Sequence, residues 1–479
     1  MKYKTGATND GKIVAVDVEV THGAGSWAPF LIDKTTKGIE LCFYETLGAL
    51  LSHVTGPYEI ENVRARAWDV LTNGPRYVPL RGTNGNYLPL AYESQVNLVA
   101  EKLGLDPIEL RVKNAIRKGG TTHFGQQLNE HVSMVAELEK LHPHYIEARE
   151  RVAQKRQSRP DGPWVYGVGV GAGWRNIGYL KTSISAGCEL DEDGTVHAMA
   201  GTVEQGQGPT TQFAQIVADS MGIPMSQLRV TLGDTEAAPY PVPTFSSVST
   251  VGTGKAVQEA AIKLRAKILD AAAVMMQCEA SELNIEQDQV VFVKAPERSV
   301  SLADIAKHFN DTGQRSLAEA EIIWSGEAPT ILYGYSAGLI EIEVNKDTGE
   351  VHLSNHVNVC DPGTRINPQA VDGQIDGAIA FGVGFALTER FHPDNPPTLK
   401  DYGLPSTLDV PESVTRLYIE NPLERGPFGA KSMAEHPGIS PIPAIINAIA
   451  DATGARVFDI PATPERVRAA IATANHAIY

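Results

Sequence analysis

Residues 426–444 read GPFGAKSMAEHPGISPIPA, and the interpretation of the whole chain starts from this stretch. Its first half is rich in glycine and small residues, which let backbone N–H groups approach a ligand closely. Its second half continues into PIPAIINAIADATG, an apolar helical pattern that ends at a glycine. Glu435 lies between the halves, where an acid alone is typical of the start of a helix. This stretch alone therefore does not predict a function, and we interpret it together with similar segments elsewhere in the chain.

Four other segments share this composition of glycine with hydroxyl or amide side chains, which suits phosphates and the edges of heterocycles. None has the P-loop spacing, and none is a GxGxxG that follows a strand and opens a helix. Each alone is typical of a turn, but five in one chain indicate a ligand site assembled from distant segments. The four are LRGTNGNY (80–87), VEQGQGPTTQ (203–212), SSVSTVGTGKA (246–256) and DGQIDG (372–377).

The regular elements predicted around these segments are mixed. IVAVDVEV (13–20) alternates like a strand, GKAVQEAAIKLRAKILDAAAVMM (254–276) has the spacing of an amphipathic helix, and residues 339–359 form a hairpin that turns at DTG. A short strand, RVFDI (456–460), is expected between the last two helices. Because no regular βαβ repeat connects these elements, the sequence predicts an α+β fold.

A chain of 479 residues is too long for one ordinary core. QSRPDGPW (157–164) interrupts a helical pattern, and we place the domain boundary there. The prediction is one domain over residues 1–157 and a second over residues 164–479.

Composition excludes several classes of function. A net charge of −16 argues against nucleic acid as a partner. No run of residues approaches the roughly 20 apolar positions that a membrane-spanning helix needs, and the first residues read as a strand rather than a signal peptide. The four cysteines, Cys42, Cys188, Cys278 and Cys360, are far apart and show no CxxC spacing. We interpret them as reduced thiols of a cytoplasmic protein, with no iron–sulfur cluster or zinc site encoded in this chain.

In their order along the chain, the five segments resemble the molybdenum-cofactor part of xanthine dehydrogenases and bacterial aldehyde oxidoreductases. LRG is similar to the family's FRG segment, EQGQG to its E-x-GQG loop, and SSVST to its SVS loop; GQIDGA is similar to GQVEGA, and GAKSMAE to GAKGVGE. The resemblance covers essentially all of the chain. It identifies the chain as the carboxyl-terminal part of a molybdopterin-binding catalytic subunit of the xanthine oxidase family, with that family's two-domain cofactor-binding architecture.

The resemblance implies a molybdopterin, often a cytosine dinucleotide in bacteria, whose molybdenum carries oxo and sulfido (sometimes selenido) ligands. The pterin dithiolene holds the metal, so no protein ligand to it is expected. Gln207 is expected near the oxo group, and Glu435 is expected to be the catalytic base, because a carboxylate in hydrogen-bond reach can take up the proton of the attacking oxygen. The residues expected to hold the cofactor are Arg81, Gly82, Gly206, Gly208, Ser247, Ser249, Gln374, Ala430 and Lys431.

The resemblance also implies partners. The family's catalytic subunit continues several hundred residues upstream, so we expect the first domain to be completed by a separate chain, as in some bacterial nicotinate dehydrogenases. Electrons are expected to pass to a subunit with 2Fe–2S clusters and to a flavin (FAD) subunit. The predicted reaction is hydroxylation of an aldehyde or an electron-poor N-heteroaromatic ring with oxygen from water.

The substrate pocket departs from that of a purine oxidase. Those enzymes have an arginine roughly where Ala49 falls and an aromatic ring where Thr83 stands. Trp174 or Tyr179 is a candidate for a replacement aromatic wall, and packing at the end of a strand is an equal alternative for both. A carbon monoxide dehydrogenase type is set aside, because its copper-binding cysteine is absent from residues 80–88. A non-catalytic paralogue or assembly subunit stays open as the second reading.

Overall fold

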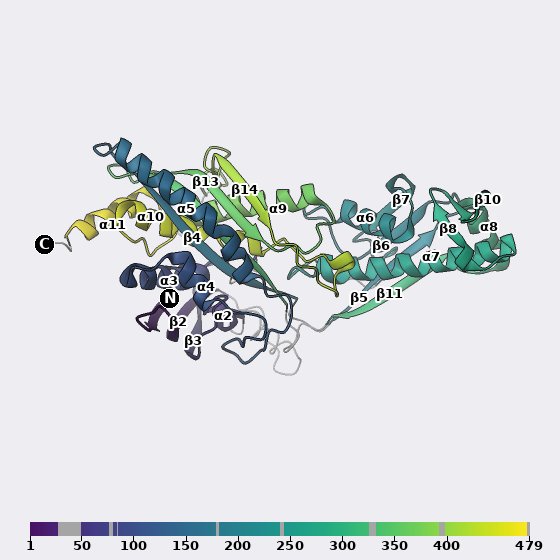
Figure 1. The fold of residues 1–479 in the computed structure, drawn as a ribbon, viewed down its shortest axis with the longest axis horizontal. Coiled ribbons are helices and arrows are strands. Elements are labelled where there is room, and N and C mark those ends of the chain that lie inside the picture. The colour runs from purple at the N-terminus through teal and green to yellow at the C-terminus, as the bar shows by residue number, and fades with distance from the viewer. Residues whose placement is uncertain are drawn as a thin grey trace.

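The computed structural model describes residues 1–26, 49–75, 80–83, 85–178, 182–239, 244–324, 332–391 and 398–476. The molecule is elongated, with two lobes side by side along its long axis (Figure 1). We call residues 182–324 the arm and the remaining described residues the main lobe. The chain enters the arm after strand β4 and returns from it into strand β12, so two neighbouring strands of the main lobe connect the lobes.

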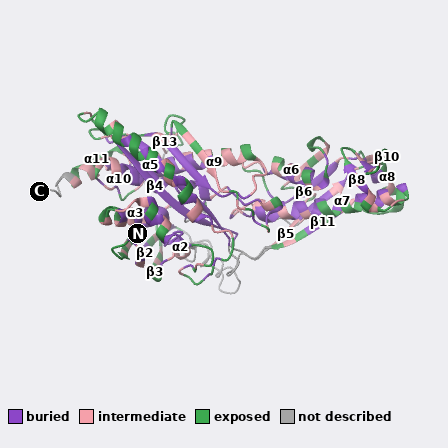
Figure 2. Ribbon diagram, viewed as in Figure 1, coloured by how far each residue is buried: buried purple, intermediate pink, exposed green. Residues whose placement is uncertain are grey.

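The main lobe is built on a four-stranded sheet in the order β14-β13-β12-β4. β4 pairs antiparallel with β12 along its full length, β12 and β13 form a hairpin, and β14 joins parallel to β13. The central strands β4, β12 and β13 are buried over most of their length (Figure 2), whereas β14 at the edge is partly exposed. Their bounds are Trp164–Ile177 for β4, Leu332–Asn345 for β12, Val351–Cys360 for β13 and Ser413–Tyr418 for β14.

Two helices cover the opposite faces of this sheet. Helix α5 (Met134–Ser158) packs on one face, in a core that includes Val168, Val170 and Trp174 of β4. Helix α10 (Pro441–Thr453) packs on the other face, in a core that includes Ile340 and Ile342 of β12. Alternate residues of β4 therefore face different helices, as the pleat of a strand requires.

The face of β4 toward α10 is a stripe of four glycines. An ideal Cβ added at Gly169 would lie 2.2 Å from the carbonyl oxygen of Ala444, and one at Gly171 would lie 2.3 Å from that of Ser440. Only glycine lets the helix backbone approach the strand backbone this closely. The period-2 pattern YGVGVGAGW thus fixes where α10 lies. The stripe is Gly167, Gly169, Gly171 and Gly173.

The described residues among the first 115 form a smaller module of the main lobe, with a three-stranded sheet in the order β1-β2-β3. A fully buried ion pair between Arg111 and Glu93, 2.8 Å apart, joins α4 to α3, and Glu93 also accepts a hydrogen bond from the backbone of Ala172 in β4. This network ties the module to the main sheet. Its elements are β1 (Lys2–Ala7), β2 (Ile13–Gly25), α2 (Ala49–His53), β3 (Asn62–Leu71), α3 (Leu88–Leu103) and α4 (Pro107–Asn114).

The arm has its own core, built on a four-stranded sheet in the order β11-β5-β6-β7. Helix α7 (Gly254–Met276) runs along this sheet and packs on α6 (Pro209–Met221). A π-helical turn, η3 (Ser249–Thr253), leads into α7. The other elements of the arm are β5 (Thr182–Leu190), β6 (Val196–Ala200), β7 (Leu228–Leu232), β8 (Leu283–Glu286), β9 (Gln289–Phe292), β10 (Ala295–Ser301), α8 (Leu302–Thr312) and β11 (Leu317–Trp324).

Two helices near the carboxyl terminus complete the main lobe: α9 (Pro368–Val383), which continues as the π-helical turn η5 (Gly384–Thr388), and α11 (Pro464–His476). Together, α9 and η5 are long and apolar enough to cross a membrane by length and composition, with a mean hydropathy of 1.2, so the prediction that no such stretch exists does not hold. Buried core helices of soluble proteins pass the same test, and α9 packs against α10.

The predicted α+β class is confirmed. The predicted helix at 254–276 is α7, and the hairpin predicted at 339–359 falls in β12 and β13. The predicted strand at 456–460 is wrong. This segment is irregular because side chains hold it instead of a neighbouring strand, with Arg456 donating to Asn447 and Glu101. The domain division at residues 157–164 stays a prediction.

Candidate active site

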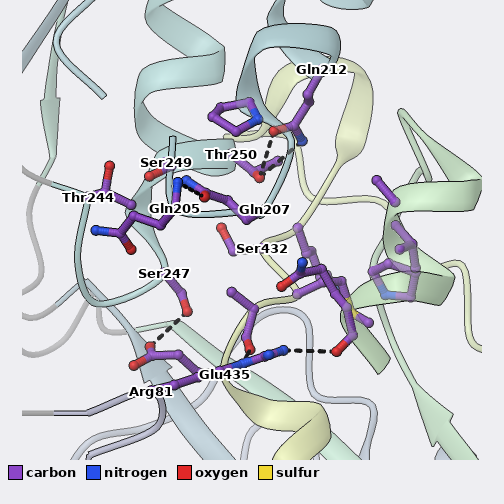
Figure 3. A pocket seen from close by; sticks show the side chains of 18 of the residues that line it. Arg81, Gln205, Gln207, Gln212, Thr244, Ser247, Ser249, Thr250, Ser432 and Glu435 are labelled. Carbon is purple, nitrogen blue, oxygen red and sulfur yellow. Dashed lines mark hydrogen bonds between the residues drawn. The ribbon is translucent and has the colours of Figure 1, made fainter. Parts of the chain in front are cut away.

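A cavity of about 1060 Å³ is lined by residues of both lobes (Figure 3). All five glycine-rich segments contribute to its wall, although they are up to 350 residues apart in the sequence. From the predicted set, the lining includes Arg81, Gln207, Ser247, Ser249, Gln374, Ala430, Lys431 and Glu435, together with Gly206 and Thr83. The sequence therefore identified one site from segments that lie far apart in the chain.

Glu435 lies in the wall of this cavity, directly before the short helix η7 (His436–Gly438). Its Oε1 accepts a hydrogen bond of 3.0 Å from the backbone N–H of Gly82, and its Oε2 accepts one of 2.7 Å from the Ser247 hydroxyl. The Nε of Arg175 lies 3.7 Å from Oε2. Only 11% of the Glu435 side chain is exposed. The carboxylate is thus fixed in place at the edge of the cavity by donors from three segments.

Ser247 is held in a backbone conformation that non-glycine residues rarely adopt. Its φ is +56°, and that of Ser246 before it is +48°. Two consecutive left-handed residues cost about 1–2 kcal/mol each, so the surrounding structure must impose this turn. One such constraint is the hydrogen bond of 2.8 Å from the N–H of Gly178, at the end of β4, to the Ser246 carbonyl. The turn directs the Ser247 hydroxyl toward the base.

Arg81 connects three of the segments. Its Nε donates to the carbonyl of Ala434, and its Nη2 donates to the carbonyl of Gln374, 2.8 Å away in α9. Burial lowers the pKa of Arg81, and the nearby Glu435 charge opposes this effect. The next residue, Gly82, has φ +77°, and an added Cβ would lie 2.6 Å from the Asn86 side chain. Glycine is therefore required where the N–H meets Glu435.

The 203–208 loop is held by one of its own residues, Glu204, which the sequence interpretation did not single out. Glu204 Oε1 accepts hydrogen bonds from the N–H groups of Gly206 (2.9 Å) and Gly208 (3.0 Å). Gln207 donates to the Val203 carbonyl at 3.0 Å and accepts from the backbone of Gln205. Gln207 faces the cavity, but these loop contacts engage its amide and both glycine N–H groups. Their contacts with a cofactor stay predictions.

Lys431 and Asp361 form a buried ion pair under the cavity wall. The Lys431 ammonium lies 2.5 Å from the Asp361 carboxylate, and the two residues are 5% and 1% exposed. Asp361 also accepts from the N–H of Gly363 at 3.0 Å. The ion pair with Asp361 neutralises the Lys431 charge and anchors the 429–435 segment, and the predicted contact of Lys431 with the cofactor stays a prediction.

The predicted substrate residues have different outcomes. Thr83 lines the cavity, and its hydroxyl donates to the Leu80 carbonyl at 2.8 Å. The interpretation of Trp174 as a pocket wall is wrong: its side chain is 1% exposed and stacks on Tyr333 with ring centroids 4.3 Å apart, on the α5 side of the sheet. Tyr179 lies outside the described residues, and Ala49 is described only as backbone in α2.

Arg175 is a charged residue of the cavity that the sequence interpretation missed. Strand alternation was the signal that could have found it, since Trp174 shares a face with Val168 and Val170 while Arg175 shares the opposite face with the glycine stripe. Gly173, the last glycine of the stripe, packs against Ile439, which follows Glu435 by four residues. Counting by twos along β4 therefore places Arg175, rather than Trp174, beside the base.

Three buried polar atoms in the cavity wall lack a hydrogen-bond partner within the described parts of the chain. They are the hydroxyls of Ser246 and Ser432 and the Nε of Arg175. A buried polar atom without a partner costs about 1–3 kcal/mol, so such atoms favour a polar ligand. The wall therefore fits a heterocyclic cofactor with many polar edges, as a molybdopterin has.

Comparison with protein-family models also indicates a molybdopterin-binding protein. Residues 140–411, more than half of the chain, match a family model described as a molybdopterin cofactor-binding domain, and residues 1–115 match a second model with that description.

Individual relatives agree with these family matches. The chain is 31% identical to the carbon monoxide dehydrogenase large chain of Hydrogenophaga pseudoflava, over 98% of this chain and 60% of that protein. It is 29% identical to the aldehyde oxidoreductase of Megalodesulfovibrio gigas, over 98% of this chain and 49% of that protein. The crystal structure of quinoline 2-oxidoreductase from Pseudomonas putida 86 superimposes with a TM-score of 0.83 at 25% identity, over 98% of this chain and 61% of that one.

These matches and the assembled cavity define a molybdopterin-binding protein. The chain belongs to the molybdopterin-binding subunits of the xanthine oxidase family. It spans about half to three fifths of the length of the relatives given above.

Proposed function

We propose that this protein is a subunit of a molybdenum hydroxylase, which oxidises an aldehyde or an N-heteroaromatic ring at an electrophilic carbon with oxygen derived from water. The observation that carries the proposal is the placement of Glu435. Its carboxylate lies in the wall of a large cavity and is held by two short hydrogen bonds from separate segments. A fixed carboxylate in such a place is suited to accept a proton during the reaction.

The molybdopterin, when bound, supplies the two-electron oxidation, and the protein supplies position and the base. In our proposal Glu435 accepts the proton on one of its carboxylate oxygens. The Gly82 N–H and the Ser247 hydroxyl orient that carboxylate. Arg81 keeps the segments of Gly82, Glu435 and Gln374 together through its contacts with backbone carbonyls. These contacts preorganise the base before substrate enters, which lowers the entropic cost of the reaction.

The proposed cofactor is a molybdopterin, in its cytosine dinucleotide form, with Ser246, Ser432 and Gln374 in the wall that holds it. Relatives named as a large chain or a large subunit support a heteromeric assembly. We propose that electrons leave to 2Fe–2S clusters and FAD on other chains, because the cysteines of this sequence show no cluster spacing. The assembly would work in the cytoplasm.

The test is purification of the native complex, followed by analysis of molybdenum, iron, flavin and pterin nucleotide and by a screen of aldehydes and N-heteroaromatic compounds. The proposal expects molybdenum and turnover of at least one compound, with iron and flavin on partner chains. Molybdenum without any turnover would favour the non-catalytic alternative. Stoichiometric iron on this chain alone would contradict the proposed division of cofactors.

A further inference from the structure

Arg175 is a buried cation that faces the same cavity as the base. Only 5% of its side chain is exposed, and its Nε has no hydrogen-bond partner in the described part of the protein. Its Nη1 donates to the side chain of Asn176, which fixes the orientation of the guanidinium. The ion-pair distance of 3.7 Å to Glu435 is too long for a direct hydrogen bond. One donor on the guanidinium edge is thus buried, oriented and free to bind a ligand.

The charges around this cavity do not balance. Among the described lining residues, the charged ones are Arg81, Arg175, Lys431 and Glu435. Lys431 is neutralised by Asp361 behind the wall, and Arg81 donates to two backbone carbonyls. Glu435 is therefore the carboxylate that both Arg81 and Arg175 share, which leaves one positive charge in excess. This excess is local, since the whole chain carries a net charge of −16.

We propose that Arg175 is a specificity-determining residue that binds a carboxylate of the substrate, so that the preferred substrates are small carboxylate-bearing aldehydes or N-heteroaromatic acids. This inference rests on the proposed function and names the substrate class of the same site. The planar guanidinium matches the geometry of a carboxylate or a phosphate. Because Arg175 lies beside Glu435, we assign the bound anion to the substrate, which reacts next to that base.

The anion could also come from a phosphate of the cofactor, and the test separates the two sources. The native complex is compared as wild type, Arg175→Met and Arg175→Lys. Specificity constants are measured for 4-formylbenzoate and its methyl ester, and molybdenum content is measured on each preparation. Equilibrium binding of benzoate and benzamide is measured by calorimetry, which requires no turnover. Arg229→Met, which removes an exposed guanidinium of the arm paired with Asp191, serves as the matched control.

The wild-type complex is expected to prefer 4-formylbenzoate over its ester. In Arg175→Met this preference should fall roughly 10- to 100-fold, the loss expected for one hydrogen bond to a charged group. Benzoate binding should weaken by a similar factor, Arg175→Lys should keep part of both, and Arg229→Met should change neither. Molybdenum content should stay at the wild-type level in all variants.

Two results would overturn the inference. One is a preference for the carboxylate that is the same in wild type and Arg175→Met. The other is a loss of molybdenum in Arg175→Met, which would assign the guanidinium to the cofactor. If the wild type oxidised no compound at all, the proposed function would fail, while benzoate binding that depends on Arg175 would still support the anion site.

Discussion

The hydroxyl of Ser247 lies 2.7 Å from Oε2 of Glu435, although 188 residues separate the two in the sequence. Ser247 belongs to the arm and Glu435 to the main lobe, so this hydrogen bond crosses between the lobes (Figure 3). The sequence assigned Ser247 to the cofactor. Its geometry also makes it a positioning residue for the proposed base, so the orientation of that base depends on how the two lobes meet, and its contact with the cofactor stays a prediction.

Replacing the base tests its role directly. Glu435→Gln keeps the size and most of the hydrogen bonding of the side chain but removes the proton acceptor. Turnover of any substrate should fall about 10²- to 10⁴-fold, while molybdenum content stays near the wild-type level. Glu286→Gln, an exposed change at the end of β8, is the matched control. Undiminished turnover in Glu435→Gln would exclude this role.

Ser247 offers a pair of variants that separate the hydroxyl from the backbone. Both Ser247→Ala and Ser247→Gly remove the hydrogen bond to Glu435, so both should lower kcat about tenfold, the effect of about 1.4 kcal/mol. Only glycine relieves the left-handed strain at φ +56°. Ser247→Gly should therefore unfold at a higher temperature than Ser247→Ala in a thermal melt. Equal melting temperatures would argue against strain at this position.

The glycine stripe of β4 predicts a large effect from one methyl group. The Cβ of Gly169→Ala would lie 2.2 Å from backbone atoms of α10 and would push the helix off the sheet. We expect a loss of about 1–3 kcal/mol or more in the free energy of unfolding. The control is Gly6→Ala in β1, where the nearest atom to the added Cβ is 3.7 Å away. A melting temperature unchanged in both variants would show that α10 can move at little cost.

The buried imidazole of His436 leads us to expect that the free energy of unfolding depends on pH. Burial lowers its pKa to about 3, helped by the positive charges of Lys431 and Arg81, whereas an unfolded histidine titrates near 6.5. The unfolded chain therefore binds this proton first as the pH falls. The contribution of neutral His436 to the free energy of unfolding is fully present above about pH 6.5 and is lost as the pH falls toward 3. At pH 5.5 this loss is about 1.4 kcal/mol.

The variant His436→Gln cannot take up this proton, so its stability should fall less between pH 8 and pH 5.5 than that of the wild type. His356 adds a similar loss in both proteins, because burial lowers its pKa to about 4. The comparison of the two proteins by denaturant titration at each pH removes this shared contribution. An identical loss in both would show that His436 does not titrate on unfolding.

Xanthine is expected to be a poor substrate. Thr83 lines the cavity where the resemblance places an aromatic ring, and a threonine cannot stack on a purine. Lost stacking costs about 0.5–1.5 kcal/mol, and each unpaired polar edge of the purine adds about 1–3 kcal/mol. Steady-state kinetics of xanthine, nicotinate and several aldehydes on the intact complex test this ranking. The highest specificity constant for xanthine would contradict the placement of the pocket.

Much of the fold follows from local sequence signals. The helical spacing of residues 254–276 predicts α7 correctly, and the DTG turn predicts the β12–β13 hairpin. The strand expected at 456–460 fails because an alternating pattern cannot show whether a neighbouring strand is present. Buried Val457 satisfies the apolar pattern while Arg456 pairs with side chains.

The site was predictable as a set of segments but not as a set of contacts. The glycine-rich composition singles out the five segments, the family resemblance picks Arg81, Ser247 and Glu435 within them, and the structure places these residues on one cavity. Composition cannot show which donor meets which acceptor, so the roles of Glu204 and Arg175 were missed. Both depend on geometry across the fold, through a tight loop in one case and the facing of a strand in the other.

The glycine stripe of β4 also constrains how such a site can evolve. Because an added Cβ at Gly167, Gly169 or Gly171 would meet backbone atoms of residues 440–452, no side chain there can shrink or turn to absorb a change. The strand that carries Arg175 and the helix packed on its glycines are therefore closed to gradual variation along this contact, and new substrate preferences must arise in the loops around them. Residues 80–83 and 244–250 line the cavity without belonging to that packed pair. A search for variants with altered selectivity would gain most by varying Thr83 and Thr244 in these loops together with Arg175, which leaves the Glu435 partners Gly82 and Ser247 in place.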